Sequence, residues 1–74
     1  MYIRRLKDLR EDKDITQEDI SKIINCKQQT YSYYEVGKRT IPYELIIELA
    51  KFYKTSVDYI LDLTNVKEPY PRKK

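Results

Sequence analysis

The chain has 74 residues, of which 41% are apolar and 36% charged, with a net charge of +3 and a sequence pI near 9.0. This length and composition indicate one small globular domain rather than a disordered chain. One cysteine and no histidine exclude an intrachain disulfide framework, a Cys/His zinc site and histidine-based catalysis. We therefore expect a protein that is not an enzyme and that has no metal site and no cofactor.

The sequence also argues against a membrane protein. No apolar run approaches the roughly 18 residues that a membrane-spanning helix needs. The charged N-terminus, MYIRRLKDLRED, lacks the apolar centre of a signal peptide. These two observations predict a cytoplasmic protein with no membrane partner.

Apolar spacing and helix-terminating residues predict five short helices in chain order. The first spans about residues 2–13, with inward residues Ile3, Leu6 and Leu9. The second follows a capping box formed by Thr16 and Asp19 and runs to about residue 24, with Ile20, Ile23 and Ile24 on one face. Residues 25–27 interrupt the helical pattern, and Asn25 suits the left-handed conformation of a tight turn.

The third predicted helix spans about residues 28–35 and ends just before Gly37, the only glycine. A helix C-terminus often requires a positive φ, which glycine adopts at least cost. Pro42 suits the start of a fourth helix, about 42–53. Ser56 suits the N-cap of a fifth helix, about 57–63, with Val57, Ile60 and Leu61 inward. We interpret Cys26 as a small buried hydrophobe.

These elements divide the chain into a domain over residues 1–63 and a flexible basic tail over residues 64–74. Helix 17–24, the short turn and helix 28–35 form a helix-turn-helix candidate over about residues 17–36. The predicted fold class is all-α, a compact bundle of five helices.

Residues 3–61 resemble the Cro/C1-type (XRE-family) helix-turn-helix domain, and in particular that of 434-type phage repressors. The matching residues are Arg10, Ile15-Thr16-Gln17, Ile20, Ile24, Tyr31, Glu35-Val36-Gly37-Lys38-Arg39, Pro42, Leu49-Ala50 and Ser56-Val57-Asp58-Tyr59-Ile60-Leu61. Ser21, Asn25 and Lys27 depart from the pattern, and Lys27 leaves the third helix without its usual side-chain cap. The resemblance implies a lambda-repressor-like DNA-binding domain and a sequence-specific transcriptional regulator, a repressor, that binds double-stranded DNA.

The family role assigns candidate site residues around the third helix, which would enter the major groove with its N-terminal residues facing base edges. Candidate base contacts are Gln28, Gln29, Tyr33, Thr30 and Ser32. Candidate phosphate contacts are Gln17, Lys27, Lys38, Arg39, Thr40 and Tyr43. The resemblance also implies a structural ion pair between Arg10 and Glu35.

One such domain makes few base contacts, so a homodimer at least on DNA is expected, with Leu63 and Val66 as exposed apolar candidates for its interface. The alternative function is a protein-binding adaptor, or an antitoxin-like partner with the same fold, for an unknown protein. Eight tyrosines suit a protein interface, whereas the two glutamines with flanking cations favour DNA.

Overall fold

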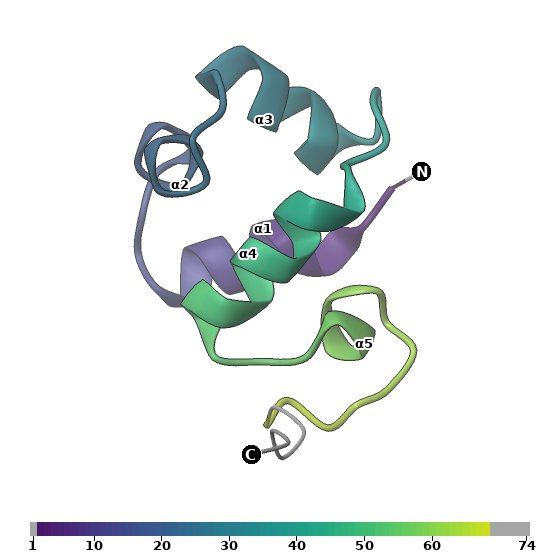
Figure 1. Cartoon of the computed structure of the whole chain (residues 1–74). Helices are drawn as coiled ribbons and strands as arrows, with labels where there is room; N and C mark the ends of the chain where they lie inside the picture. The colour runs from purple at the N-terminus through teal and green to yellow at the C-terminus, as the bar shows by residue number, and fades with distance from the viewer. Residues whose placement is uncertain (1, 69–74) are drawn as a thin grey trace.

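The computed structural model describes residues 2–68 and contains five helices and no strand within that range. The helices are α1 (Arg4–Asp12), α2 (Gln17–Ile23), α3 (Gln28–Val36), α4 (Tyr43–Tyr53) and α5 (Val57–Ile60). α2 packs on α3, α1 on α3, and α4 on α5. In Figure 1, α3 lies at one end of the molecule and α5 at the other, with α1 and α4 between them. The predicted all-α bundle is confirmed.

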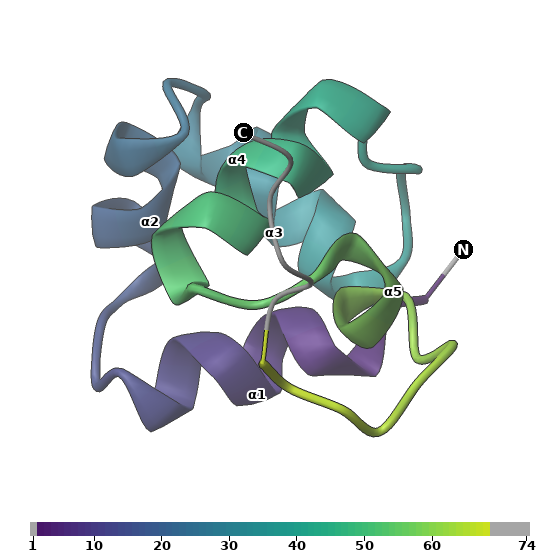
Figure 2. The same ribbon diagram turned by 60° about the horizontal axis from the view of Figure 1, so that its bottom comes forward.

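One hydrophobic core lies between the helices. Its buried apolar residues are Ile3, Leu6, Leu9, Ile20, Ile24, Tyr31, Tyr34, Ile41, Ile46, Leu49, Ala50, Tyr53 and Ile60. In Figure 2 α5 lies beside one end of α1, and the segment after α5 runs past that helix, to which Arg5 joins it through hydrogen bonds. Each short helix is stabilised mainly by this shared burial, because isolated helices of this length are marginal in water.

The predicted helix ends are set by local chemistry. Thr16 and Asp19 form the capping box in both directions, with distances of 3.1 Å for each hydrogen bond. Asn25 has φ 57° at the turn before α3. Gly37 ends α3 with φ 83°, and a Cβ there would lie 3.2 Å from the Cα and Cβ of Tyr2. The one glycine is therefore required both by its backbone conformation and by the close approach of the N-terminal chain.

Two sequence expectations about the helices were wrong. Ile23 is 48% exposed, because Ile20 and Ile24 are four residues apart and share the inward face, whereas Ile23 is rotated by about 100° from Ile24. α5 ends at Ile60 rather than near residue 63. Asp62 adopts a positive φ of 65°, which terminates the helical path.

The predicted flexible tail, residues 64–74, extends beyond the described residues at position 69. Its first residues are hydrogen bonded to the domain. The carbonyl oxygen of Thr64 accepts from Arg5 at 2.7 Å, and the hydroxyl of Thr55 donates to the carbonyl oxygen of Lys67. The boundary at residue 63 stays a prediction.

Candidate nucleic-acid interface

The turn between α2 and α3 is a short connection in which the backbone N–H groups of Asn25 and Cys26 are hydrogen bonded. The backbone N–H of Cys26 donates to the carbonyl oxygen of Ser21 at 2.8 Å. Ser21 is buried, and its hydroxyl donates to the carbonyl oxygen of Glu18 at 2.8 Å, so a serine is accommodated inside the motif. Cys26 packs against the core, and burial raises the pKa of its thiol. Cys26 is thus only partly buried, less than the small buried hydrophobe expected from the sequence.

α3 has one buried face and one outward face. Tyr31 is fully buried, and Tyr34 and Glu35 are also buried. Gln28 and Gln29 are exposed at the start of the helix, and Thr30, Ser32 and Tyr33 are partly exposed. Lys27 precedes the helix and makes no side-chain capping hydrogen bond. The first turn of α3 therefore presents free backbone N–H groups and two amide side chains to the outside.

A buried ion pair fixes α3 against α1. The Arg10 guanidinium donates to Glu35 through Nε at 2.8 Å and Nη2 at 3.1 Å, and through Nη1 to the carbonyl oxygen of Ile15 at 2.9 Å. Gln17 donates from Nε2 to Glu35 Oε1 at 3.1 Å. The carboxylate of Glu35 therefore joins α1, α2 and α3 at one point.

The electrostatics of this pair favour both charged forms. The hydrogen bond to Glu35 raises the pKa of Arg10. Burial by itself would raise the pKa of Glu35, but the hydrogen bonds from Arg10 and Gln17 outweigh it and hold that pKa below its ordinary value. The pair is structural, because Glu35 is only 4% exposed and faces the inside of the domain.

The candidate phosphate contacts surround the outward face of α3. Lys27 lies before the helix; Lys38, Arg39 and Thr40 lie in the loop after it; and Tyr43 begins α4, all of them exposed. Gln17 is half-buried at the start of α2, and its amide is occupied by Glu35. Any anion that Gln17 contacts would therefore meet its backbone N–H rather than its amide.

Two cations lie close to the ring of Tyr33. Lys38 Nζ is 5.3 Å and Arg39 Cζ is 5.6 Å from the ring centroid, within the range of a cation–π contact. Gln29 Nε2 donates to the Tyr33 hydroxyl at 2.9 Å. The structure therefore brings a candidate base-contacting pair and two candidate phosphate contacts together on one outward surface.

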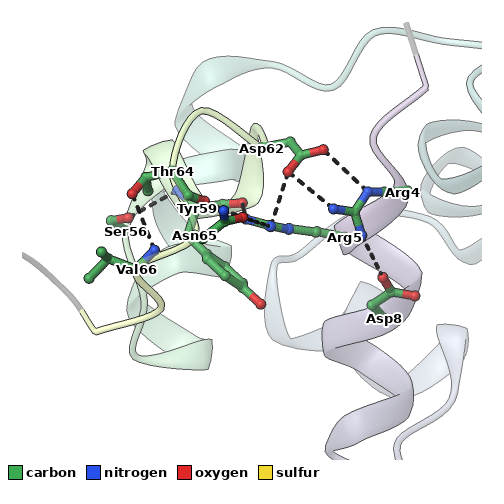
Figure 3. A network of polar contacts seen from close by, with 9 residues as sticks. All are labelled: Arg4, Arg5, Asp8, Ser56, Tyr59, Asp62, Thr64, Asn65 and Val66. Atoms are coloured by element: carbon green, nitrogen blue, oxygen red, sulfur yellow. Dashed lines mark hydrogen bonds and ion pairs between the residues drawn. The ribbon is translucent and has the colours of Figure 1, made fainter.

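The burial of Arg5 was not predicted from the sequence. Its Nη1 donates to the carbonyl oxygens of Tyr59 and Thr64, each at 2.7 Å, and its Nη2 to Asn65 Oδ1 at 3.1 Å. It also forms an ion pair with Asp62 at 3.0 Å and stacks 3.9 Å above the Tyr59 ring. Figure 3 shows the guanidinium enclosed by the segment after α5.

Helical spacing could have predicted that Arg5 is buried. Arg5 precedes Leu9 by four residues and so shares its buried face. This cluster lies at the α5 end of the molecule, opposite α3 (Figure 1), so it supports the scaffold rather than the candidate interface.

Over residues 2–68, the cysteine and the acidic side chains form no group of three or more that could bind a metal ion. None of the helices in that range has the length and apolar character needed to cross a membrane.

Comparison with known proteins identifies the motif. The Helix-turn-helix family model matches residues 6–60. The chain is 35% identical over its full 74 residues to the HTH-type transcriptional regulator YobD of Bacillus subtilis strain 168, covering 66% of that protein. It is 36% identical over 53 residues to the cryptic phage CTXphi transcriptional repressor RstR of Vibrio cholerae, with 72% of this chain and 48% of RstR covered.

A solved structure has the same fold. A transcriptional regulator from Listeria innocua superposes with a TM-score of 0.78 at 22% identity, over 97% of this chain and 65% of that one. The chain thus spans about two thirds of YobD and of the Listeria regulator, and about half of RstR. These proteins share the helical domain with this chain and extend beyond the matched part.

Proposed function

The chain belongs to the Cro/C1-type helix-turn-helix family, and we propose that it is a sequence-specific regulator of transcription that binds double-stranded DNA through α3. The observation that carries the proposal is the outward face of α3. Two exposed glutamines open the helix, and cations lie on both sides of it. A glutamine amide offers both a donor and an acceptor, and it can pair with adenine N6 and N7 in the major groove.

Base contacts are assigned to Gln28 and Gln29, with Tyr33, Thr30 and Ser32 as further candidates. Gln28 and Gln29 lie at the N-terminal end of α3, the part of a recognition helix that meets base edges in helix-turn-helix complexes. Phosphate contacts are assigned to Lys27, Lys38, Arg39, Thr40 and Tyr43, and to the backbone N–H of Gln17. Lys27 at the N-terminus of α3 is unfavourable beside the positive end of the helix dipole, and a bound phosphate would offset that cost.

Repression is the proposed outcome of binding, by analogy with the phage repressor RstR. A repressor of this kind acts by occupying a promoter, so its place of action is the cytoplasm, where bacterial and phage DNA lie. The adaptor alternative is not favoured, because a purely protein-binding domain has no need of the exposed glutamine pair between cations.

A homodimer on DNA is the proposed binding form. Leu63 is 71% and Val66 54% exposed, and both follow α5 on a segment that Arg5 and Thr55 hold to the domain. Two α3 helices in successive major grooves would lie about 34 Å, or about 10 base pairs, apart. The bound sequences should then show two-fold symmetry with that spacing.

The test is selection from a pool of random double-stranded DNA. The proposal predicts enrichment of a short, two-fold symmetric sequence. It also predicts that Lys38→Ala/Arg39→Ala weakens binding to all duplexes and reduces the slope of log K against log salt by about 2. A pool that shows no enrichment over random sequence would refute the specific-regulator proposal and leave the adaptor function as the one to test, by affinity capture of a protein partner.

A further inference from the structure

The hydrogen bond between Gln29 and Tyr33 constrains one of the two glutamines and not the other. Gln29 Nε2 donates to the Tyr33 hydroxyl, four residues on and one turn further along α3, at 2.9 Å. Gln28, which is exposed beside it, makes no side-chain hydrogen bond to any residue in the described part of the chain. The hydrogen bond therefore favours one orientation of the Gln29 amide before any DNA is present, whereas no such bond within the described residues restricts the Gln28 amide.

The constrained amide keeps the groups that a base would need. An amide nitrogen has two N–H donors, and an amide oxygen has two lone pairs. Tyr33 occupies one N–H, so one N–H and the oxygen remain. Adenine in the major groove offers N7 as an acceptor and N6 as a donor, which this remaining pair complements. The contact with Tyr33 therefore orients Gln29 without using up its capacity for a bidentate contact.

Tyr33 is itself held from two sides. Its carbonyl oxygen accepts the backbone N–H groups of Lys38 at 2.9 Å and Arg39 at 3.3 Å, and its ring lies under the side chains of the same two residues. The phenol is half-buried, so its ring packs between the helix and the cations of the loop after α3.

We infer that Tyr33 is a positioning residue: its hydroxyl orients the Gln29 amide, and the Gln29–Tyr33 pair specifies adenine at one base pair of each half-site. The inference rests on the proposed function, because it assigns a specificity role within the same interface. It differs from independent base contacts by Gln29 and Tyr33, because it predicts that the phenol hydroxyl matters only while Gln29 is present. Gln28 should specify its own base pair without help from Tyr33.

The experiment is a mutant cycle measured on base preference. Affinities of the wild type, Tyr33→Phe, Gln29→Ala and the double variant are measured by fluorescence anisotropy. The duplexes carry the selected sequence and each single base-pair change in one half-site. Tyr33→Phe keeps the ring and its two cations and removes only the hydroxyl. Tyr59→Phe is the matched control, since Tyr59 lies in α5 under Arg5 and away from α3.

The expected result is that Tyr33→Phe lowers the preference for adenine at one position of the half-site by about 2- to 10-fold. The same substitution should have no effect in the Gln29→Ala background, and Tyr59→Phe should leave all preferences unchanged. If the wild type is selective but Tyr33→Phe keeps every preference, or lowers it equally without Gln29, the inference fails and the proposed function stands. If the wild type itself shows no base preference, both fail together.

Discussion

Replacing Arg10 by methionine should destabilise the domain strongly, because the substitution leaves the buried carboxylate of Glu35 without its positively charged partner. The Arg10 and Glu35 side chains are only 14% and 3% exposed, with a bidentate contact at 2.8 and 3.1 Å. Removing one partner of a buried ion pair typically costs about 3–5 kcal/mol. A domain of 74 residues has a total unfolding free energy of about 4–11 kcal/mol. Arg10→Met should therefore remove about a quarter or more of the stability.

The compensating double variant separates the cost of the stranded charge from the value of the pair. Arg10→Met/Glu35→Leu replaces both charges by apolar groups, and such exchanges are often neutral or stabilising. We expect it to recover most of the stability lost in Arg10→Met. The partly exposed Gln17 amide, which loses its partner, can turn to water.

Urea unfolding followed by circular dichroism measures both variants. Glu18→Gln is the matched control, because the Glu18–Lys22 pair at 3.4 Å has both side chains exposed and should be worth less than about 1 kcal/mol. A loss in Arg10→Met as small as that in the control would refute the argument that Glu35 is held charged inside the domain. If the double variant is as unstable as Arg10→Met, the ion pair itself is needed to keep α1 and α3 in their arrangement.

Three further outcomes follow from the same structure. The pKa of Glu35 is held below the ordinary 4.5, so its contribution to stability is complete above that pH and is lost as the pH falls through the lowered pKa. Glu35→Gln should therefore reduce the loss of stability at acid pH in pH-dependent unfolding, and an unchanged loss would assign it to other carboxylates. Gly37→Ala should lower the free energy of unfolding by at least about 1–2 kcal/mol, because of the positive φ of 83° and the contact with Tyr2. Lys54→Gly, at a positive φ of 55°, should not destabilise the domain. Equal effects of the two variants in thermal unfolding would contradict this. Arg5→Met should lower stability by at least about 2 kcal/mol and speed amide hydrogen exchange after α5, and unchanged exchange there would show that Arg5 does not hold the segment.

Features set by neighbouring residues were predictable from the sequence. The Thr16 capping box, the left-handed Asn25 and the glycine that ends α3 each depend on chemistry within a few residues. Gln28 and Gln29 were assigned by the family resemblance, and both are exposed at the start of α3. Local pattern was therefore sufficient for the helix ends, whereas the candidate interface came from the resemblance.

Features that depend on distant partners were not predictable. Arg5 meets acceptors 54 to 60 residues away, and nothing near it in the sequence indicates them. The length of α5 was overestimated, because its end depends on Asp62 turning back toward the first helix, where it pairs with Arg4 and Arg5. The hydrogen bond from the Gln17 amide to Glu35 likewise could not be predicted from the sequence, since 18 residues separate the two.

The most direct measurement of the central claim compares the wild type with Gln28→Ala/Gln29→Ala on the selected duplex and on a scrambled duplex, at two salt concentrations. The wild type should prefer the selected duplex. The double variant should lose that preference and keep a weak, salt-dependent affinity for both duplexes, because the cations around α3 remain. A double variant that discriminates between the duplexes as well as the wild type would contradict base recognition by the first turn of α3.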